Sequence, residues 1–569
     1  MRAVLPFLMC CCAVAATPTA EIKVDQVGYP ANAPKLAMVV SANQARDFTV
    51  RRAANDSVAF QGKLSAPVAD ADSGDRVQTA DFSKLSSSGR YYLDVPGVGR
   101  SWKFDVGPDV YARAYYLAMR AFYAQRCGTA VDLGPQFPGY SHAACHLNGA
   151  YHASTGKTGP RAPSRGWHDA GDYGRYVVNS GITTGTLLWT WEMYGARIKN
   201  VKLDIPESGN GTPDILSEVR WNLDWMLSMQ DDDGGAWQKQ TLAEGFGGFI
   251  LPEKEDGPSY VVGTGTAPYK SSCATADLAA VAAIAARVYR PFDQAYADRN
   301  LAAARKAWDW LARYPDVLYL HDPPGIRSGT YGDKDCGDER LWAAAELWRT
   351  TRDDVYQRYF LAHYGDYLKT LAPGVRPPEW SGVAPFGLWA YVLGGGKDGA
   401  AVKAIRSRSV AAADDIAARA SGDGYRVTLL AGDYVWGSNA IAGNYALQLL
   451  VTNMLHPDRR YVETALETLH YLLGRNTFSL SYVTGVGENP YRHPHHRLSG
   501  GTGKPEPWPG FLSGGPNADR QDAVLKALPA GLAPAKVYAD AQASYASNEI
   551  AINWNAVLVF MLASSTPEK

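Results

Sequence analysis

The sequence predicts a mainly α-helical protein in which helical hairpins close into a ring, preceded by a small β-sandwich. Three observations support this fold class. Residues 21–106 hold short β-prone runs with a period of two, which is typical of strands. From Asp109 onward, apolar residues recur at helical spacing, and long Gly/Pro-rich segments connect the periodic stretches. No fixed repeat length is present, so the alternative of an open helical repeat array lacks its usual signature.

The N-terminus has the pattern of a secretory signal peptide. Arg2 precedes an apolar run over 3–16, and small residues close the run. We expect residues 1–20 to direct export to the periplasm or the cell exterior, residues 21–106 to form the sandwich, and residues 107–569 to form the helical domain. Because no other apolar run approaches the roughly 18 residues that a membrane helix requires, we expect no membrane span. We also expect a monomer.

Five runs in the first domain predict strands. A hairpin turn with the sequence PGVG is predicted at 96–99, between the last two runs. Short strands at this spacing, within fewer than about a hundred residues, are typical of a β-sandwich. The predicted strands are 22–24, 36–40, 48–50, 91–95 and 102–106.

The second domain has about twelve segments with helical periodicity. In the segment 458–473, Tyr461 and Leu469 share an apolar stripe, Asp458 stands in capping position, and Gly474 follows as a stop. The region 477–545 has no regular pattern, and loops of that length in a compact domain are usually functional. The predicted helices lie near 109–126, 174–195, 212–230, 273–289, 296–313, 337–351, 353–370, 383–393, 399–419, 438–455, 458–473 and 546–564.

Charge and composition narrow the class of ligand. The net charge is −1, from 56 basic and 57 acidic residues, and no basic stripe is present. Nucleic acid and anionic membranes are therefore not expected as partners. The chain has 16 Trp and 33 Tyr, whose flat apolar faces and polar edges suit sugar rings, although a large helical protein also uses such residues as core.

The first segment with catalytic character is 166–176, which reads GWHDAGDYGRY. Asp169 and Asp172 lie three residues apart, and Gly171 permits a tight turn between them. At the start of a helix, both carboxylates would project toward one point and contact one water. The alternative is that both merely cap the following helix, since acidic residues favour its first turn. On the spacing alone, capping is the stronger interpretation.

The second segment is 544–556, which reads SYASNEIAINWNA. Glu549 stands where polar residues give way to an apolar helix, so its carboxyl would face the open end of the ring in a partly desolvated place. Desolvation raises a carboxyl pKa and keeps the group protonated, as a general acid requires. The alternative is again a first-turn Glu. Glycoside hydrolysis needs two carboxyl groups on opposite sides of the substrate, and these two segments supply them from opposite ends of the domain.

The third segment is 489–497, which reads NPYRHPHHR and is rich in rings and hydrogen-bond donors. A metal site is the competing interpretation of its histidines, but no Cys or acidic partner lies at suitable spacing, which favours sugar binding. A further turn at 433–439, DYVWGSN, carries Trp436, which would be either a wall of the site or core.

Together these segments resemble glycoside hydrolase family nine, the inverting cellulase family, preceded by the immunoglobulin-like domain that many bacterial members carry. Further matching segments are 22–29, IKVDQVGY, and 332–346, GDKDCGDERLWAAAE. The resemblance covers nearly the whole mature chain. It implies a six-hairpin α/α barrel with an open cleft, in which Asp172 is the general base, Asp169 orients the water and Glu549 is the general acid. The residues expected to bind the saccharide are His495, Arg497, Tyr545 and Trp436.

The cysteines raise the question of a metal. Two disulfides are the default for four cysteines in an exported protein. However, Cys127, Cys145, His146 and His168 make a Cys₂His₂ set of the kind that holds structural zinc, and zinc at matching positions in some family members favours zinc over a Cys127–Cys145 disulfide. Such a site would brace the loop that carries Asp172. The four cysteines outside the expected signal are Cys127, Cys145, Cys273 and Cys336.

Calcium is also common in the resembled family. Residues 207–214, ESGNGTPD, are similar to a segment near one such site. Here Ser217 precedes Glu218 where many relatives have Asp, which weakens the prediction of calcium.

The leading functional hypothesis is an endo-acting β-1,4-glucanase that acts on soluble or amorphous glucan. An alternative within the family is an exo-acting enzyme on cello-oligosaccharides or glucosamine oligomers. An alternative of another class is a noncatalytic saccharide-binding protein on the same fold, against which the intact carboxylates argue.

Overall fold

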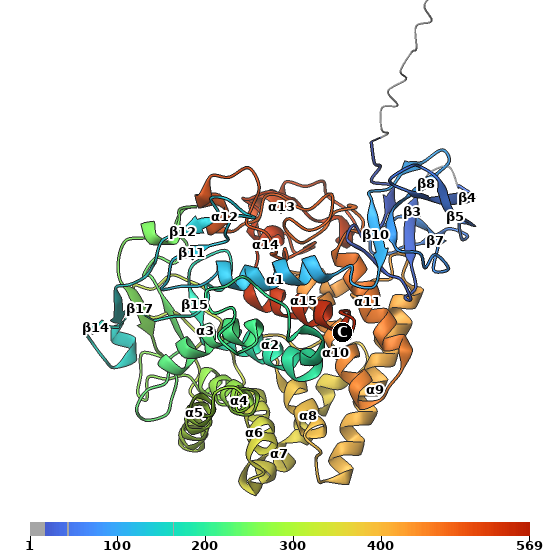
Figure 1. Cartoon of the computed structure of the whole chain (residues 1–569). Helices are drawn as coiled ribbons and strands as arrows, with labels where there is room; N and C mark the ends of the chain where they lie inside the picture. The colour runs from blue at the N-terminus through green and yellow to red at the C-terminus, as the bar shows by residue number, and fades with distance from the viewer. Residues whose placement is uncertain (1–16, 42–44, 163, 569) are drawn as a thin grey trace, which may run out of the picture.

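The computed structural model describes residues 17–41, 45–162 and 164–568. The expected signal peptide, residues 1–20, therefore lies almost entirely outside the described residues. Figure 1 shows a small strand domain at the N-terminal side of a larger helical domain. No helix in the described part of the chain has the length and apolarity needed to cross a bilayer.

The strand domain consists of two sheets around one apolar core. Their bounds are β1 (Ile22–Lys23), β2 (Gly28–Pro30), β3 (Leu36–Val40), β4 (Asp47–Arg52), β5 (Val58–Lys63), β6 (Val68–Ala69), β7 (Arg76–Asp81), β8 (Gly89–Val95), β9 (Gly99–Arg100) and β10 (Phe104–Gly107). One sheet has the order β1-β3-β7-β6 and the other the order β2-β10-β8-β4-β5, with β9 on β8. Side chains from both sheets, such as Val39 and Leu93, share the core, and each of the five predicted strands overlaps an observed one. The predicted turn at 96–99 joins β8 to β9.

The helical domain is a closed ring. The helices are α1 (Ala112–Ala124), α2 (Val177–Ile198), α3 (Asp214–Ser228), α4 (Ser272–Val288), α5 (Gln294–Arg313), α6 (Gly337–Thr351), α7 (Asp354–Tyr367), α8 (Ala384–Leu393), α9 (Gly399–Gly422), α10 (Ser438–Leu455), α11 (Arg459–Leu472), α12 (Arg497–Thr502), α13 (Ala523–Lys526), α14 (Tyr545–Asn548) and α15 (Ile552–Ser564). Each of α2, α4, α6, α8, α10 and α15 packs against the next, and α15 closes on α2. The helices α3, α5, α7, α9, α11 and α1 pack outside them. This closure excludes an open repeat array.

Burial separates the inner from the outer helices. The inner helix α4 buries every residue except Arg287. The outer helix α11 buries one face, which includes Tyr461 and Leu469, and the Asp458 side chain caps its N-terminus by accepting the Arg460 N–H. The inner ring is therefore the more buried one, and the predicted cap is confirmed.

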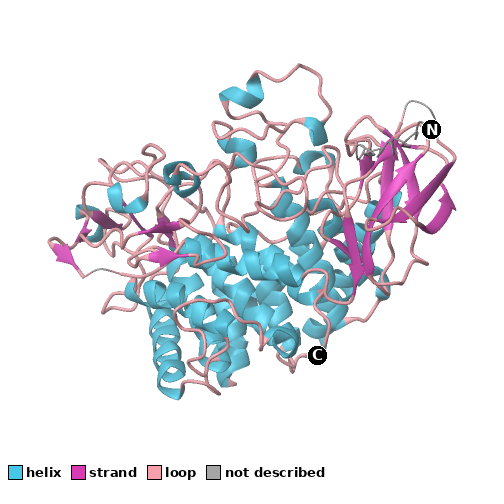
Figure 2. Ribbon diagram, turned by 45° about the horizontal axis from the view of Figure 1, so that its top comes forward, coloured by secondary structure: helices cyan, strands magenta, loops and turns pink. Residues whose placement is uncertain are grey.

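Loops and short strands cover one end of the ring (Figure 2). The strands there are β11 (Val131–Asp132), β12 (Ser141–His142), β13 (Gly149–Tyr151), β14 (Pro160–Arg161), β15 (Arg175–Tyr176), β16 (Lys239–Thr241) and β17 (Ser259–Val262). The predicted helix at 174–195 begins only at Val177, because Arg175 and Tyr176 pair with β16 as strand β15. The predicted helix at 546–564 is interrupted, since Glu549 is extended and α15 begins at Ile552.

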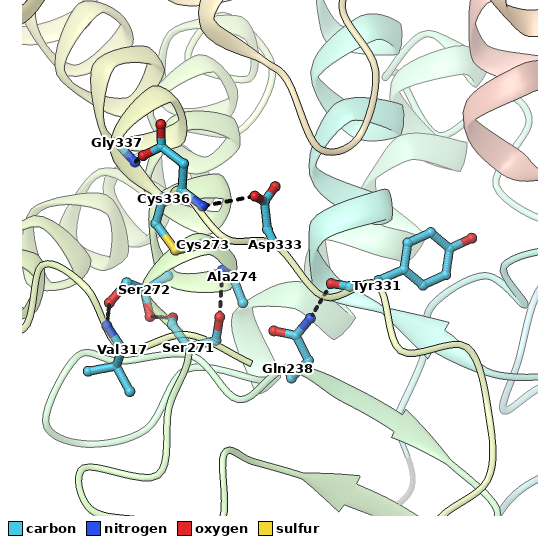
Figure 3. The surroundings of a disulfide bond; sticks show 12 residues. Gln238, Ser271, Ser272, Cys273, Ala274, Val317, Tyr331, Asp333, Cys336 and Gly337 are labelled. Carbon is cyan, nitrogen blue, oxygen red and sulfur yellow. Dashed lines mark hydrogen bonds between the residues drawn. A yellow bond between two sulfur atoms is a disulfide. The ribbon is translucent and has the colours of Figure 1, made fainter. Parts of the chain in front are cut away.

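A disulfide joins two inner helices at this same end. Cys273, in the first turn of α4, is bonded to Cys336 at the N-cap of α6. Figure 3 shows Asp333 and Tyr331 near this bond, and the Gln238 side chain donates to the Tyr331 carbonyl oxygen at 3.0 Å. The bond thus anchors the segment that leads from Tyr331 into α6.

Replacing both Cys273 and Cys336 by Ala should destabilise the helical domain. The bond spans 63 residues, and a crosslink over such a loop contributes about 2–4 kcal/mol to the free energy of unfolding. Calorimetry should therefore show a lower unfolding temperature for the double variant. As a control, a reductant should lower the unfolding temperature of the wild type but not of the variant; equal unfolding temperatures for both proteins would contradict the prediction.

Candidate active site

The two aspartates lie on a turn that main-chain hydrogen bonds hold. The Asp169 N–H donates to the Gly174 carbonyl oxygen at 2.9 Å, and the Asp169 carbonyl oxygen accepts the Ile552 N–H at 2.8 Å. The prediction that the aspartates project from a helix start is wrong, because β15 separates the turn from α2. The capping alternative is also wrong, since α2 has Tyr176 as its N-cap and no acidic residue in its first turn.

Glu549 lies on an extended segment, between α14 and α15, that crosses this turn. Residues 549–551 form isolated bridges with His495, Ser513 and Ala170. The Glu549 carbonyl oxygen also accepts the Gly514 N–H at 2.8 Å. The first-turn alternative for Glu549 is wrong, because α15 is capped by Ala551 and has no acidic residue in its first turn.

Gly171 allows the three segments to meet. Its carbonyl oxygen accepts the Arg497 N–H at 2.9 Å. A Cβ atom at this position would stand 2.3 Å from the His495 carbonyl oxygen and 3.1 Å from Glu549 Oε1. The glycine is therefore required for close approach of two backbones, rather than only for a turn.

The aspartates receive hydrogen bonds from residues that the sequence analysis missed. Asp172 Oδ2 accepts the Tyr176 hydroxyl at 2.8 Å. Asp169 Oδ2 accepts the Tyr331 hydroxyl at 2.6 Å, and its Oδ1 accepts the Asn179 amide at 2.7 Å. The one signal for Tyr331 is its place directly before the matching segment 332–346.

Burial and mutual repulsion shift the carboxyl pKa values upward. Burial and the charge of Asp172 raise the pKa of Asp169 to about 8. Burial raises the pKa of Asp172, although hydrogen bonds from Tyr176 and the Gly174 N–H oppose the shift. Burial, followed by the charges of Asp172 and Asp169, raises the pKa of Glu549 well above its usual range. Glu549 is consequently the group best suited to carry a proton at neutral pH.

Two cavities, each of about 390 Å³, meet at the carboxyl groups. Asp172, Glu549, Trp436 and Phe246 line both. We name the cavities the Trp380 cavity and the His495 cavity. The Trp380 cavity is further lined by Asp169, Tyr176, Tyr331, Glu379, Trp380 and Trp554. The His495 cavity is further lined by Gly171, Phe249, His495, Arg497 and Tyr545.

The predicted sugar-binding residues all lie at these cavities, in different settings. The Trp436 side chain is 41% exposed and its indole N–H donates to Glu549 Oε2 at 3.0 Å. The Tyr545 ring packs against Trp436 with centroids 5.3 Å apart. The His495 Nδ1 atom lies 2.7 Å from the Gln542 carbonyl oxygen. Arg497 is only 3% exposed, so most of its guanidinium faces protein.

The predicted Cys₂His₂ residues form one compact cluster. The two Sγ atoms of Cys127 and Cys145 are 3.9 Å apart and unbonded, so the alternative disulfide is not formed. Cys127 Sγ lies 3.4 Å from His146 Nδ1, and Cys145 Sγ lies 3.7 Å from His168 Nε2. Tetrahedral zinc, with its usual bond lengths, requires separations of about 3.8 Å between sulfurs and about 3.6 Å between sulfur and nitrogen. The cluster therefore fits a tetrahedral metal ion.

The predicted calcium segment has no comparable arrangement. The Arg126 guanidinium donates to both oxygens of Glu207, at 3.0 and 2.9 Å, and to both oxygens of Glu218. Asp214 Oδ2 accepts the Ser208 hydroxyl and the Leu203 N–H. A side-chain cation therefore already holds Glu207 and Glu218, whereas Asp214 Oδ1 is buried without a hydrogen-bond partner among the described residues.

Comparison with known proteins decides the family. The model of glycosyl hydrolase family 9 matches residues 111–562, and the model of the cellulase N-terminal ig-like domain matches residues 17–100. The chain belongs to glycosyl hydrolase family 9. It is thus a glycoside hydrolase, and the predicted α/α barrel with its N-terminal immunoglobulin-like domain is confirmed.

Relatives within family 9 cover almost the whole chain. Endoglucanase D of Acetivibrio thermocellus is 37% identical over 95% of this chain and 83% of its own length. The xyloglucan-specific endo-beta-1,4-glucanase BoGH9A of Bacteroides ovatus is 33% identical over 97% of this chain and 96% of its own. The crystal structure of a metagenome-derived family 9 endoglucanase is 38% identical, with a TM-score of 0.87 over 96% of this chain and 98% of that chain. A Zn-binding triple mutant of the family 9 endoglucanase J30 is 34% identical, with a TM-score of 0.87 over 95% of this chain and 100% of that chain.

Replacing Gly171 by Ala should reduce kcat about 100-fold. The added methyl group would push the turn that carries Asp172 away from His495 and Glu549, and misplacing a catalytic group by about 1 Å can cost about 100-fold in rate. Steady-state kinetics and circular dichroism would measure activity and folding. Gly432→Ala is the matched control, since a Cβ there meets nothing within 4 Å. Equal kinetics for the two variants would refute this account of Gly171.

Proposed function

We propose that this family 9 hydrolase cleaves β-1,4-glucosidic bonds within glucan chains by a single displacement with inversion, with Asp172 as general base and Glu549 as general acid. One observation carries the assignment: these two carboxyl groups come from opposite ends of the helical domain and line both cavities together. Family membership and the endoglucanase relatives support the glucan substrate.

The mechanism follows from the placement of the two carboxyl groups and from the raised pKa of Glu549. Glu549 donates its proton to the glycosidic oxygen as the bond to the anomeric carbon breaks. A water on the opposite face attacks that carbon, and Asp172 accepts the proton that the water loses. Inverting enzymes separate the two carboxyl groups by roughly 6.5–9.5 Å to admit this water. Asp169, held by Tyr331 and Asn179, would orient the water through its hydrogen bonds.

The cavities favour internal cleavage of a chain. Aromatic residues line both: Trp380 and Trp554 on one side, and Phe249 and Tyr545 on the other. Sugar units can therefore bind on each side of the scissile bond, as an endo-acting enzyme requires. The exo-acting alternative would release only terminal units, so rapid loss of viscosity of carboxymethylcellulose would indicate internal cleavage. Product release from cello-oligosaccharides, chitosan oligomers and xyloglucan would identify the substrate.

Zinc is the metal proposed for the Cys₂His₂ cluster. Burial opposes ionisation of Cys127, but hydrogen bonding from Cys145 and the charges of Arg175, His146 and His168 hold its pKa well below the usual range, which favours a thiolate ligand. A closed four-ligand site supplies structural rigidity and no reactive water. Calcium is not part of the proposal, because Arg126 holds two of the segment's acidic residues, Glu207 and Glu218. Export through the signal peptide and a monomeric state remain proposed.

Asp172→Asn and Glu549→Gln should each reduce kcat on cello-oligosaccharides by about 10²–10⁴-fold, with substrate binding still measurable by calorimetry. A dinitrophenyl β-cellobioside separates the roles, since its leaving group needs no proton. Glu549→Gln should retain much more activity on this substrate than Asp172→Asn. Nuclear magnetic resonance of early wild-type products should show the α-anomer; a β-anomer would refute the inverting mechanism, and full activity of either variant would refute the assignment.

Trp436→Phe should move the alkaline limb of the kcat/KM profile to higher pH. The indole N–H stabilises ionised Glu549 and lowers its pKa, so removal raises that pKa and keeps the acid protonated further into the alkaline range. We expect a shift of roughly half a unit to one unit. Tyr545→Phe is the control, because its hydroxyl donates to the Gln521 carbonyl oxygen instead. A shift to lower pH would contradict this hydrogen-bond effect.

Elemental analysis of the purified protein should give about one zinc ion per chain. Removal of the ion by a chelator should expose two titratable thiols, from Cys127 and Cys145, and lower the unfolding temperature, since an ion that binds the folded state stabilises it. Cys145→Ser should lose the ion. A metal-free protein whose peptides with these cysteines are lighter by two hydrogen atoms would support the disulfide instead.

A further inference from the structure

One buried carboxylate links the Cys₂His₂ cluster to the active-site cleft. Glu255 Oε2 lies 2.9 Å from His146 Nε2, and Glu255 Oε1 lies 2.5 Å from Arg497 Nη1. The three side chains are 5% exposed or less. The other ring nitrogen of His146 faces Cys127. A single side chain therefore touches a predicted metal ligand and a residue that lines the His495 cavity.

Arg497 in turn holds two parts of the active site. Its guanidinium Nε donates to the Gly248 carbonyl oxygen at 2.7 Å, and its backbone N–H donates to Gly171 beside the base. The guanidinium also lies over the Tyr173 ring, 4.6 Å from the centroid. The Tyr173 hydroxyl donates to the Ile250 carbonyl oxygen at 2.7 Å. Arg497 and Tyr173 thus fasten residues 244–257, which we name the cleft loop.

The cleft loop brings aromatic side chains to the substrate cavities. Phe246 is 59% exposed and lines both cavities. Phe249 lines the His495 cavity and packs edge-on against the His495 ring, 5.2 Å away. An exposed ring at the meeting point of two cavities is suited to stack on a sugar, and its position depends on the anchors at Gly248 and Ile250.

We propose that Glu255 is a positioning residue that couples occupancy of the Cys₂His₂ site to the placement of Arg497 and the cleft loop, and hence to binding of the saccharide by Phe246. The saccharide in this inference is taken from the proposed function, whereas the coupling between the metal site and the cleft loop does not depend on it. His146 would be held on one side by a metal ion that it binds together with Cys127, Cys145 and His168, and on the other side by Glu255. Glu255 in turn neutralises and orients Arg497. Because Glu255 contacts both His146 and Arg497, its loss should weaken both metal binding and loop order.

Glu255→Gln is the test variant. Asp256→Asn is its matched control, because it also removes one negative charge, but from the adjacent, exposed position. Three quantities are measured on the zinc-loaded chain: transfer of zinc to a chelator, hydrogen exchange of peptides covering 244–250, and KM and kcat on cello-oligosaccharides. For Glu255→Gln we expect zinc affinity to fall about 10–100-fold, exchange of the loop to accelerate, and KM to rise several-fold with a smaller change in kcat. The control should match the wild type.

Two further arms keep the test decisive if Glu255→Gln folds poorly. Removal of zinc from the wild type should accelerate exchange in 244–250, and Phe246→Ala should raise KM without changing zinc transfer. The inference is overturned if zinc removal leaves loop exchange unchanged, or if Glu255→Gln alters only the metal or only the loop. Zinc transfer and exchange need no turnover, so failure of the coupling is distinguishable from failure of the proposed glucan hydrolysis.

Discussion

The opposition of acid and base depends on main-chain contact at the seam where the helical ring closes. The base turn leads into α2 and the acid segment leads into α15, and these are the two inner helices that complete the ring against each other. The Ile552 N–H donates to the Asp169 carbonyl oxygen, and the Arg497 N–H donates to that of Gly171. Since backbone groups make these bonds, the ring topology itself brings together carboxyl groups from remote parts of the chain.

The surroundings of each carboxyl group favour different roles, that of base for the aspartates and that of acid for Glu549. Asp172 and Asp169 each accept a tyrosine hydroxyl, which favours their ionised forms. Glu549 accepts the indole N–H of Trp436 and the main-chain N–H of Gly171. Burial raises the pKa of all three, and the aspartate charges raise that of Glu549 further. Negative charge placed on the base turn therefore helps to keep the proton on the acid, because a second charge in the same buried volume is costly.

The sequence predicts most of the ring because burial of whole helix faces produces long periodic patterns, as at Tyr461 and Leu469. It misplaces the starts of α2 and α15 for a physical reason. Ile550 and Ala551 continue the apolar pattern, but their main chain bridges Ser513 and Ala170, and periodicity carries no information about such partners. The Cys₂His₂ residues are predictable from residue type together with the family resemblance, because residue type alone also allows a Cys127–Cys145 disulfide. Tyr331 and Glu255 are not, because ordinary loop residues acquire their roles only through tertiary contacts.

The open end of the barrel also explains why crosslinks gather around the site. A turn at this end needs tertiary contacts to fix it, because ordering each loop residue costs backbone entropy. On one side, the Cys273–Cys336 bond anchors the segment from Tyr331, whose hydroxyl holds Asp169. On the other side, His168 directly precedes Asp169, and its N–H donates to the Gln125 carbonyl oxygen at the end of α1. A metal ion at the Cys₂His₂ cluster would tie α1, the loop with Cys145 and the base turn together. Asp169 is thus constrained from both directions.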